Sequence, residues 1–129
     1  MKNVTAAIIE RDGRYLLARR APGQNLAGYW EFPGGKVEAN ETFEDCLARE
    51  LMEELNLETQ VLDHFCDSVY HYDKGSINLL AYRVQILGGQ MKLSVHDQVD
   101  WFEPQEMLAL NLAPANRLAV IADYYINVV

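Results

Sequence analysis

The chain has 129 residues, of which 50% are hydrophobic and 23% charged, and its formal net charge is −8. This length and composition predict a single soluble globular domain over residues 1–129. The acidic balance argues against a nucleic-acid polymer as partner, because the phosphate backbone requires a positive protein surface.

The first forty residues are expected to form short strands joined by turns. Three apolar, β-branched or aromatic runs predict the strands: residues 4–9, 15–19 and 29–32. Residues rich in Gly, Pro, Asn and Asp separate or follow them: 11–14, 20–28 and 33–35. Residues 36–38 are expected to be extended.

A helix is predicted over residues 43–55. Thr42 is a suitable N-cap, and Asp45 three residues later completes an acidic variant of the capping box. Five apolar residues recur at helical spacing and should form its buried face: Phe43, Cys46, Leu47, Leu51 and Leu55.

The second half of the chain is expected to alternate between strands and helices. Apolar runs predict strands at residues 59–72, 77–87 and 101–102, with a turn at residues 88–89. Proline begins each of two predicted helices, at 104–108 and 114–128. The mixed order of elements predicts one domain of the α/β or α+β class.

Three carboxylates are concentrated near the end of the predicted helix 43–55. Glu50, Glu53 and Glu54 stand at i, i+3 and i+4, so they share one face and repel one another. A hard divalent cation such as Mg²⁺ would neutralise them. The alternative interpretation is a solvated acidic helix face.

Residues 35–57 resemble the Nudix box, G-x5-E-x7-R-E-U-x-E-E-x-G-U, where U is a bulky apolar residue. The matching positions are Gly35, Glu41, Arg49, Glu50, Leu51, Glu53, Glu54 and Leu57. Asn56 stands where the family usually has glycine. Asn is the residue that best replaces glycine in a left-handed conformation, so the departure is conservative.

The resemblance implies an α/β/α sandwich with a central mixed sheet and a hydrolase that breaks phosphoanhydride bonds. It implies Glu50, Glu53, Glu54 and the backbone carbonyl of Gly34 as ligands of Mg²⁺, with Glu53 central and Mn²⁺ as a substitute ion. Either Glu50 or Glu53 would deprotonate the attacking water. Arg49 stays protonated and would orient the glutamates, or form an ordinary surface ion pair.

A further acidic residue often precedes the tryptophan strand in related enzymes, and here Val95 occupies its position. Asp97, or less favourably Asp100, is the candidate to replace it as a base. His96 matches the family pattern and is expected in a loop, where it either contacts substrate or is structural.

Residues 19–21, 30–38 and 112–116 resemble the MutT group of this family, which clears oxidised nucleoside triphosphates such as 8-oxo-dGTP. Asn116, after a Pro-Ala pair, would read the base, while Phe32 packs against it and Arg20 borders the pocket. Helix capping and core packing are the alternatives for Asn116 and Phe32.

Three other functions stay open. A sister group similar to cytidine-nucleotide pyrophosphohydrolases shares the W-E-F-x-G-G-K-V-E run and tends to have an acidic residue at position 116. Hydrolysis of another nucleoside diphosphate-X compound, such as ADP-ribose, is a second. A non-catalytic nucleotide-binding module is the third, and the intact set of box glutamates argues against it.

Cys46 and Cys66 lack metal-site spacing, and two buried free thiols are expected rather than a disulfide. No signal peptide is visible at residues 1–4, and no apolar run approaches the roughly 20 residues needed to span a bilayer. A cytoplasmic enzyme, monomeric or homodimeric, is therefore expected.

Overall fold

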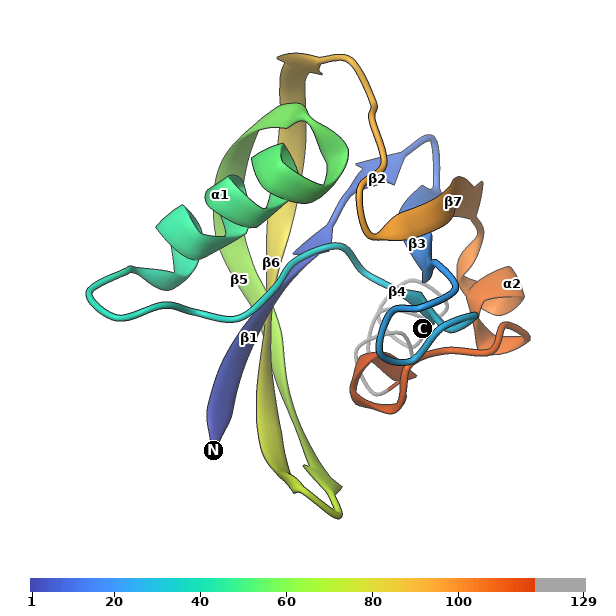
Figure 1. Ribbon diagram of the computed structural model, residues 1–129. Helices are drawn as coiled ribbons and strands as arrows, with labels where there is room; N and C mark the ends of the chain where they lie inside the picture. The colour runs from blue at the N-terminus through green and yellow to red at the C-terminus, as the bar shows by residue number, and fades with distance from the viewer. Residues whose placement is uncertain (118–129) are drawn as a thin grey trace.

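In the computed structural model of the protein, residues 1–117 are described (Figure 1). Within this range the strands are β1 (Lys2–Ile8), β2 (Glu10–Arg11), β3 (Arg14–Arg20), β4 (Trp30–Glu31), β5 (Leu57–Tyr72), β6 (Gly75–Gly89) and β7 (His96–Phe102). The helices are α1 (Phe43–Leu55) and α2 (Pro104–Leu108), and residues 114–117 are also helical. The remainder of the helix predicted at 114–128 lies outside the described residues.

The strands form two groups. β6 lies between β1 and β5, parallel to β1 and antiparallel to β5. β3 pairs antiparallel with β2, β4 and β7. The combination of parallel and antiparallel pairs confirms the mixed sheet predicted from the sequence.

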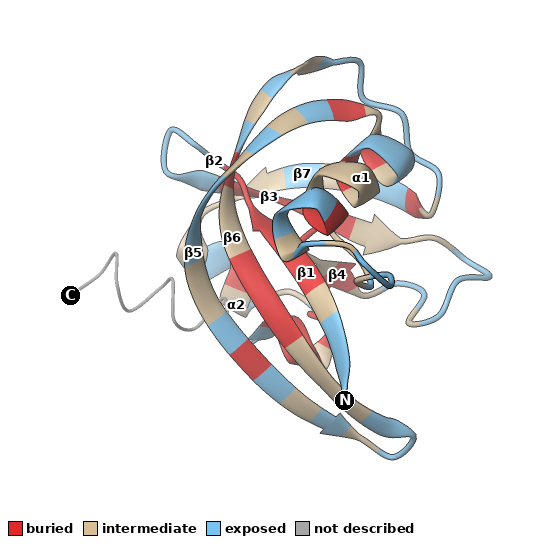
Figure 2. Cartoon of the chain, turned by 90° about the vertical axis from the view of Figure 1, so that its left-hand side faces the viewer, coloured by how far each residue is buried: buried red, intermediate tan, exposed pale blue. Residues whose placement is uncertain are grey.

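Neighbouring residues of β1 pack on opposite faces of the sheet. Ala6 belongs to an apolar cluster that includes Met107 of α2 and Leu112, whereas Ala7 belongs to a second cluster that includes Leu51 of α1. Each fully buried leucine or methionine stabilises the fold by roughly 1.5–3 kcal/mol. Figure 2 shows the buried positions in the middle of β6 and on part of α1. The sheet is thus covered by helical segments on both faces.

Local sequence signals set both ends of α1. The Thr42 hydroxyl accepts a hydrogen bond from the Asp45 N–H at 3.1 Å, as the predicted N-cap should. Asn56 has φ 58° and ψ 37°, the left-handed conformation expected at the box glycine position. Leu51 is fully buried, as predicted, but Phe43 is partly exposed and is not among the buried residues of the helix.

Several predictions about the second half need correction. Residues 88–89 do not form a turn, because Gly88 and Gly89 continue β6 and pair with Glu58 and Leu57. β5 accordingly begins at Leu57 rather than at residue 59. β7 begins at His96, in the segment that was expected to be a loop. In each case pairing with a distant strand extends the element beyond its apolar run.

Cys46 and Cys66 are not joined in a disulfide, as expected from the sequence. Cys46 is buried, whereas Cys66 is partly exposed, so the expectation of two buried thiols holds for the first alone. Within residues 1–117, no helix is long and apolar enough to cross a membrane.

Candidate active site

A cavity of about 420 Å³ opens between β1, α1 and the segment that follows β4. Its volume falls in the range of small-molecule sites in proteins, roughly 300–1,000 Å³. Six of the residues proposed from the sequence line it: Arg20, Phe32, Gly34, Glu50, Glu54 and Asn116. Two other candidates on α1, Arg49 and Glu53, do not belong to the cavity wall that the described residues form.

Residues 33–37 run antiparallel along β1, on the edge opposite β6. The N–H of Ala7 donates to the carbonyl of Pro33, and the N–H of Thr5 donates to the carbonyl of Gly35, both at 2.8 Å. These two hydrogen bonds hold the segment against β1 on either side of Gly34.

The Gly34-Gly35 backbone is confined between β1 and α1. A Cβ at Gly34 would collide with the backbone of Thr5, and a Cβ at Gly35 would collide with the carboxylate of Glu50. A side chain therefore does not fit at Gly34, whereas at Gly35 it would displace the carboxylate of Glu50 from its present position.

Glu50 and Glu54 bring their carboxylates to the cavity wall from successive turns of α1. Burial, reinforced by the negative charges of Glu50 and Glu31, raises the pKa of Glu54 to about 8. The Oε2 atom of Glu54 is buried and makes no hydrogen bond to any described residue. A buried carboxylate oxygen without a donor is costly, and a cation is a natural partner for it.

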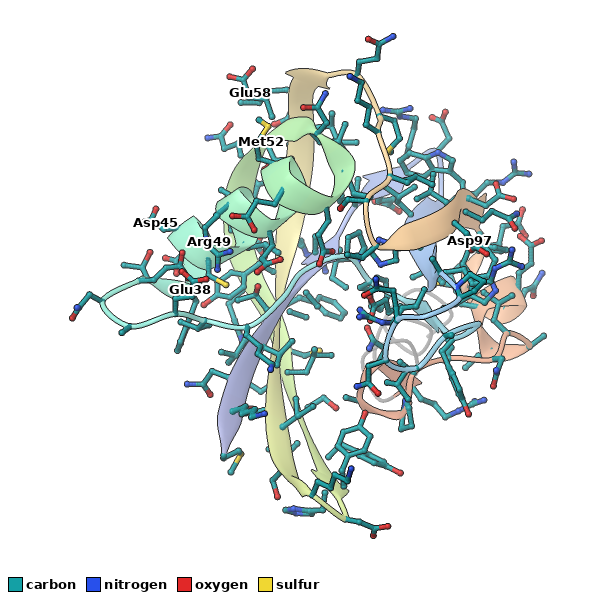
Figure 3. All side chains as sticks on the ribbon, viewed as in Figure 1. Glu38, Asp45, Arg49, Met52, Glu58 and Asp97 are labelled. Carbon is teal, nitrogen blue, oxygen red and sulfur yellow. The ribbon has the colours of Figure 1, made fainter. Side chains whose placement is uncertain are left out.

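Arg49 organises the acidic residues around α1. Its Nε and Nη2 donate to both oxygens of Glu41 at 2.7 and 3.0 Å, and its Nη1 donates to Glu50 at 2.9 Å and to Glu53 at 3.1 Å. Arg49 and the neighbouring Glu38 are labelled in Figure 3, on α1 and in the loop before it. The orienting role expected for Arg49 thus has a geometric basis.

Glu53 differs from the other two box glutamates in its surroundings. Its side chain is 59% exposed, whereas that of Glu50 is 14% exposed. In the part of the chain that the structure describes, no three His, Cys, Asp or Glu side chains lie close enough together to hold a metal ion as they stand. Glu50 and Glu54 therefore face the cavity, while Glu53 lies at the surface against Arg49.

Glu31 is a central residue of the site that the sequence analysis did not single out. Its Oε2 accepts a hydrogen bond from Nη1 of Arg20 at 3.0 Å and lies 2.9 Å from Nε2 of His96. His96 is buried, at the start of β7, and Glu31 lines the cavity. Glu31 belongs to the W-E-F run, but no local pattern predicts its contact with His96, which lies 65 positions away.

Asp97 is placed away from the cavity. Its two oxygens accept hydrogen bonds from Nε and Nη2 of Arg19 at 2.9 and 3.1 Å, and this pairing lowers the pKa of Asp97. Figure 3 shows Asp97 on β7, well apart from Arg49 on α1. The geometry therefore offers no support for Asp97 as the base, and Asp100 bonds locally to the N–H of Trp101.

Asn116 and Phe32 meet at the cavity wall. The Oδ1 of Asn116 accepts a hydrogen bond from the backbone N–H of Phe32 at 3.0 Å. Both residues are buried, with 6% and 3% of their surface exposed. Among the described residues, Nδ2 of Asn116 makes no hydrogen bond, so its two donors stay available to a ligand.

The mixed sheet, its helical layers and the carboxylate helix beside a glycine pair are features of one protein family. The chain belongs to the Nudix family, because the model of the NUDIX domain matches residues 1–123. The chain is 41% identical over 116 residues to a CTP pyrophosphohydrolase of Escherichia coli, covering 90% of this chain and 86% of that protein. It is 33% identical over 114 residues to an 8-oxo-dGTP diphosphatase of Haemophilus influenzae, covering 88% and 84%.

A solved structure agrees with these relatives. The solution structure of the E. coli ORF135 protein superposes with a TM-score of 0.88 at 38% identity, covering 99% of this chain and 91% of that one. The predicted Nudix fold of the α/β class is thereby confirmed. The chain is a Nudix hydrolase, and Nudix hydrolases generally need a divalent metal.

Proposed function

We propose that this chain hydrolyses nucleoside triphosphates to the monophosphate and pyrophosphate, acting as one Nudix domain over residues 1–129. The leading substrate is an oxidised purine nucleotide such as 8-oxo-dGTP. One observation carries the proposal: a single cavity joins the carboxylates of Glu50 and Glu54 to the amide of Asn116. One nucleotide could thus place its phosphates near the carboxylates and its base near the amide of Asn116.

The donor set fits Mg²⁺. Glu50, Glu53, Glu54 and the Gly34 carbonyl would supply oxygen ligands only, which Mg²⁺ and Mn²⁺ accept. The unpaired, buried Oε2 of Glu54 supports this assignment.

Mg²⁺, when bound, would neutralise phosphate charge and lower the pKa of an attacking water. Glu50 or Glu53 would take the proton from that water as its oxygen forms a bond to phosphorus and the P–O bond to the leaving group breaks. Arg49, which contacts both carboxylates, would hold them in place and itself transfers no proton.

Base recognition would rest on Asn116 and its neighbours. Because Oδ1 already accepts from Phe32, the free Nδ2 donors would bind a carbonyl oxygen on the base edge. Phe32 would supply an apolar surface, and Arg20 would border the pocket while paired with Glu31.

Cytidine nucleotides are the alternative substrates. The chain is 41% identical both to a CTP pyrophosphohydrolase and to a putative 8-oxo-dGTP diphosphatase, so identity supports the two interpretations equally. Asn116 favours the oxidised purine, because the sister group resembled by the sequence tends to have an acidic residue there. A cytoplasmic location and a monomeric or homodimeric state stay predictions.

A pyrophosphate-release assay with Mg²⁺ tests the proposal by comparing kcat/KM for 8-oxo-dGTP, dGTP, dCTP, 5-methyl-dCTP and ADP-ribose. A lead of 8-oxo-dGTP over dGTP is expected. A higher kcat/KM for the cytidine nucleotides would instead identify them as the substrates, with the same catalytic residues. No turnover of any of the five would contradict the proposed reaction.

A further inference from the structure

Thr5 is a polar residue in the buried middle of β1, with 1% of its surface exposed. Its neighbours in the strand are apolar, and a buried hydroxyl is unfavourable unless it makes hydrogen bonds. Its Oγ1 donates to the Gly35 carbonyl at 3.2 Å, and its N–H donates to the same oxygen at 2.8 Å. The carbonyl of Gly35, in the glycine segment formed by Gly34 and Gly35, therefore accepts two hydrogen bonds from Thr5.

Cys46 of α1 also contacts Thr5 and the segment that contains Gly35. Its Sγ lies 3.4 Å from Oγ1 of Thr5 and 3.3 Å from the carbonyl of Lys36, and the thiol is fully buried. It also lies 3.6 Å from the Gly35 carbonyl. Three segments thus meet at one small polar cluster: β1, residues 35–36 and α1.

The cluster lies next to both parts of the proposed metal site. Gly35 directly follows Gly34 and lies against the carboxylate of Glu50. Cys46 precedes Glu50 by one helical turn, so the two side chains lie on the same face of α1. Fixing the Gly35 carbonyl against Cys46 therefore fixes the Gly34 carbonyl relative to the Glu50 carboxylate.

We propose that Thr5 is a positioning residue for the metal site, acting with Cys46 through the carbonyl of Gly35. The inference rests on the proposed function, because it takes Gly34 and Glu50 as ligands of a divalent cation. Thr5 itself binds neither the metal nor the reacting atoms in this role. It sets the spacing between a ligand from the glycine segment and a ligand from α1.

The test is Thr5→Val, which keeps the shape of the side chain and removes the hydroxyl. Mn²⁺ binding to the nucleotide-free protein, measured by electron paramagnetic resonance, should weaken about fivefold, the worth of roughly one neutral hydrogen bond. Thr5→Ser restores the hydroxyl and should restore most of the affinity. In turnover assays, Thr5→Val should raise the KM for Mg²⁺ while the KM for nucleotide at saturating Mg²⁺ stays unchanged.

Ser68→Ala is the matched control, because it removes another buried hydroxyl whose Oγ donates to the Ala115 carbonyl at 3.0 Å. It should lower the Tm without changing Mn²⁺ affinity. Wild-type Mn²⁺ affinity in Thr5→Val would overturn the inference, as would an equal loss in Ser68→Ala or Thr5→Ser.

If Thr5→Val does not fold, Cys46→Ala provides the second variant, and unchanged Mn²⁺ affinity in it would also overturn the inference. Failure of the wild-type protein to bind Mn²⁺ at all would instead contradict the proposed function on which the inference rests. The two failures are therefore distinguishable.

Discussion

Arg49 holds both carboxylate oxygens of Glu41, with Nε 2.7 Å from Oε2 and Nη2 3.0 Å from Oε1. The contact joins the loop before α1 to the middle of the helix. Because the remaining nitrogen, Nη1, reaches Glu50 and Glu53, anchoring by Glu41 also restricts where those two carboxylates can lie. Glu41 thus supports the site from a distance, through Arg49.

Glu41→Gln should destabilise the protein in a pH-dependent way. Arg49, helped by the N–H of Glu38, lowers the pKa of Glu41 from its ordinary 4.5 to about 2. The ionised form is favoured by folding, so its stabilising effect is complete above pH 4.5 and is lost as the pH falls toward 2. The Tm difference between wild type and Glu41→Gln should therefore shrink over that interval.

Thermal unfolding followed by circular dichroism at a series of pH values measures this difference. Glu58→Gln, an exposed substitution on β5 at a residue labelled in Figure 3, is the control and should give a small, nearly constant difference. A Tm gap for Glu41→Gln that stays constant from neutral to acid pH would contradict the importance of the ion pair.

Glu53→Gln should abolish metal-dependent turnover, with a loss of at least about a hundredfold in kcat, and leave the fold intact. The side chain is 59% exposed, so the substitution removes little packing. Pyrophosphate release and the Tm should be measured on the same preparation. Near-normal activity would refute the role of Glu53 and leave Glu50 and Glu54 as the functional pair.

The sequence predicted α1 accurately because the signals that define it are local. Thr42 caps one end and Asn56 closes the other, so the predicted bounds and the observed Phe43–Leu55 agree. The spacing of the box glutamates likewise follows from helix geometry alone. The different exposure of their side chains does not, since it depends on distant segments such as Gly35, which lies against the carboxylate of Glu50.

The sequence did not predict the features that depend on pairing between strands far apart in the chain. Gly88 and Gly89 have the composition of a turn, yet they form strand because Glu58 and Leu57 pair with them. His96 and Asp97 lack an apolar run, yet β7 begins there because it pairs with β3. The role of Glu31 as a partner of His96 depends on the same pairing of β3 with β4 and β7.

The effect of Mg²⁺ on stability should grow with pH. Burial and neighbouring acids raise the pKa of Glu54 from 4.5 to about 8, so the metal-free folded protein holds a proton that the unfolded chain releases. In the absence of metal, Glu54 therefore lowers stability as pH rises from 4.5 to about 8. Because Mg²⁺ binds the ionised carboxylate, the increase in Tm on adding Mg²⁺ should be larger at about pH 8.5 than at about pH 6.5.

Glu54→Gln removes this titration and should make the Mg²⁺-induced change in Tm small at both pH values. Differential scanning calorimetry with Mg²⁺ and with chelator measures the change in Tm for both proteins at both pH values. A wild-type Tm increase that is the same at both pH values would show that Glu54 does not take part in binding the ion.

Asn116→Asp should shift base preference toward cytidine nucleotides. An aspartate retains an oxygen to accept from the Phe32 N–H, so the buried contact at 3.0 Å is kept. It replaces the Nδ2 donors by an acceptor, which favours an exocyclic amino group such as that of cytosine over a carbonyl. The ratio of kcat/KM for 8-oxo-dGTP to that for dCTP should fall about tenfold or more, as expected when one base-specific hydrogen bond of roughly 1–3 kcal/mol is exchanged.

Asn116→Ala is the comparison variant, because it loses both the contact with Phe32 and the Nδ2 donors, whereas Asn116→Asp loses the donors alone. It should erode discrimination between bases and also lower the Tm, since the N–H of Phe32 loses its partner. If Asn116→Asp and Asn116→Ala reduce kcat/KM equally for every nucleotide, Asn116 holds the cavity wall together without reading the base. Lost discrimination in Asn116→Ala, together with a preference shifted toward cytidine nucleotides in Asn116→Asp, would show that Nδ2 contacts the base directly.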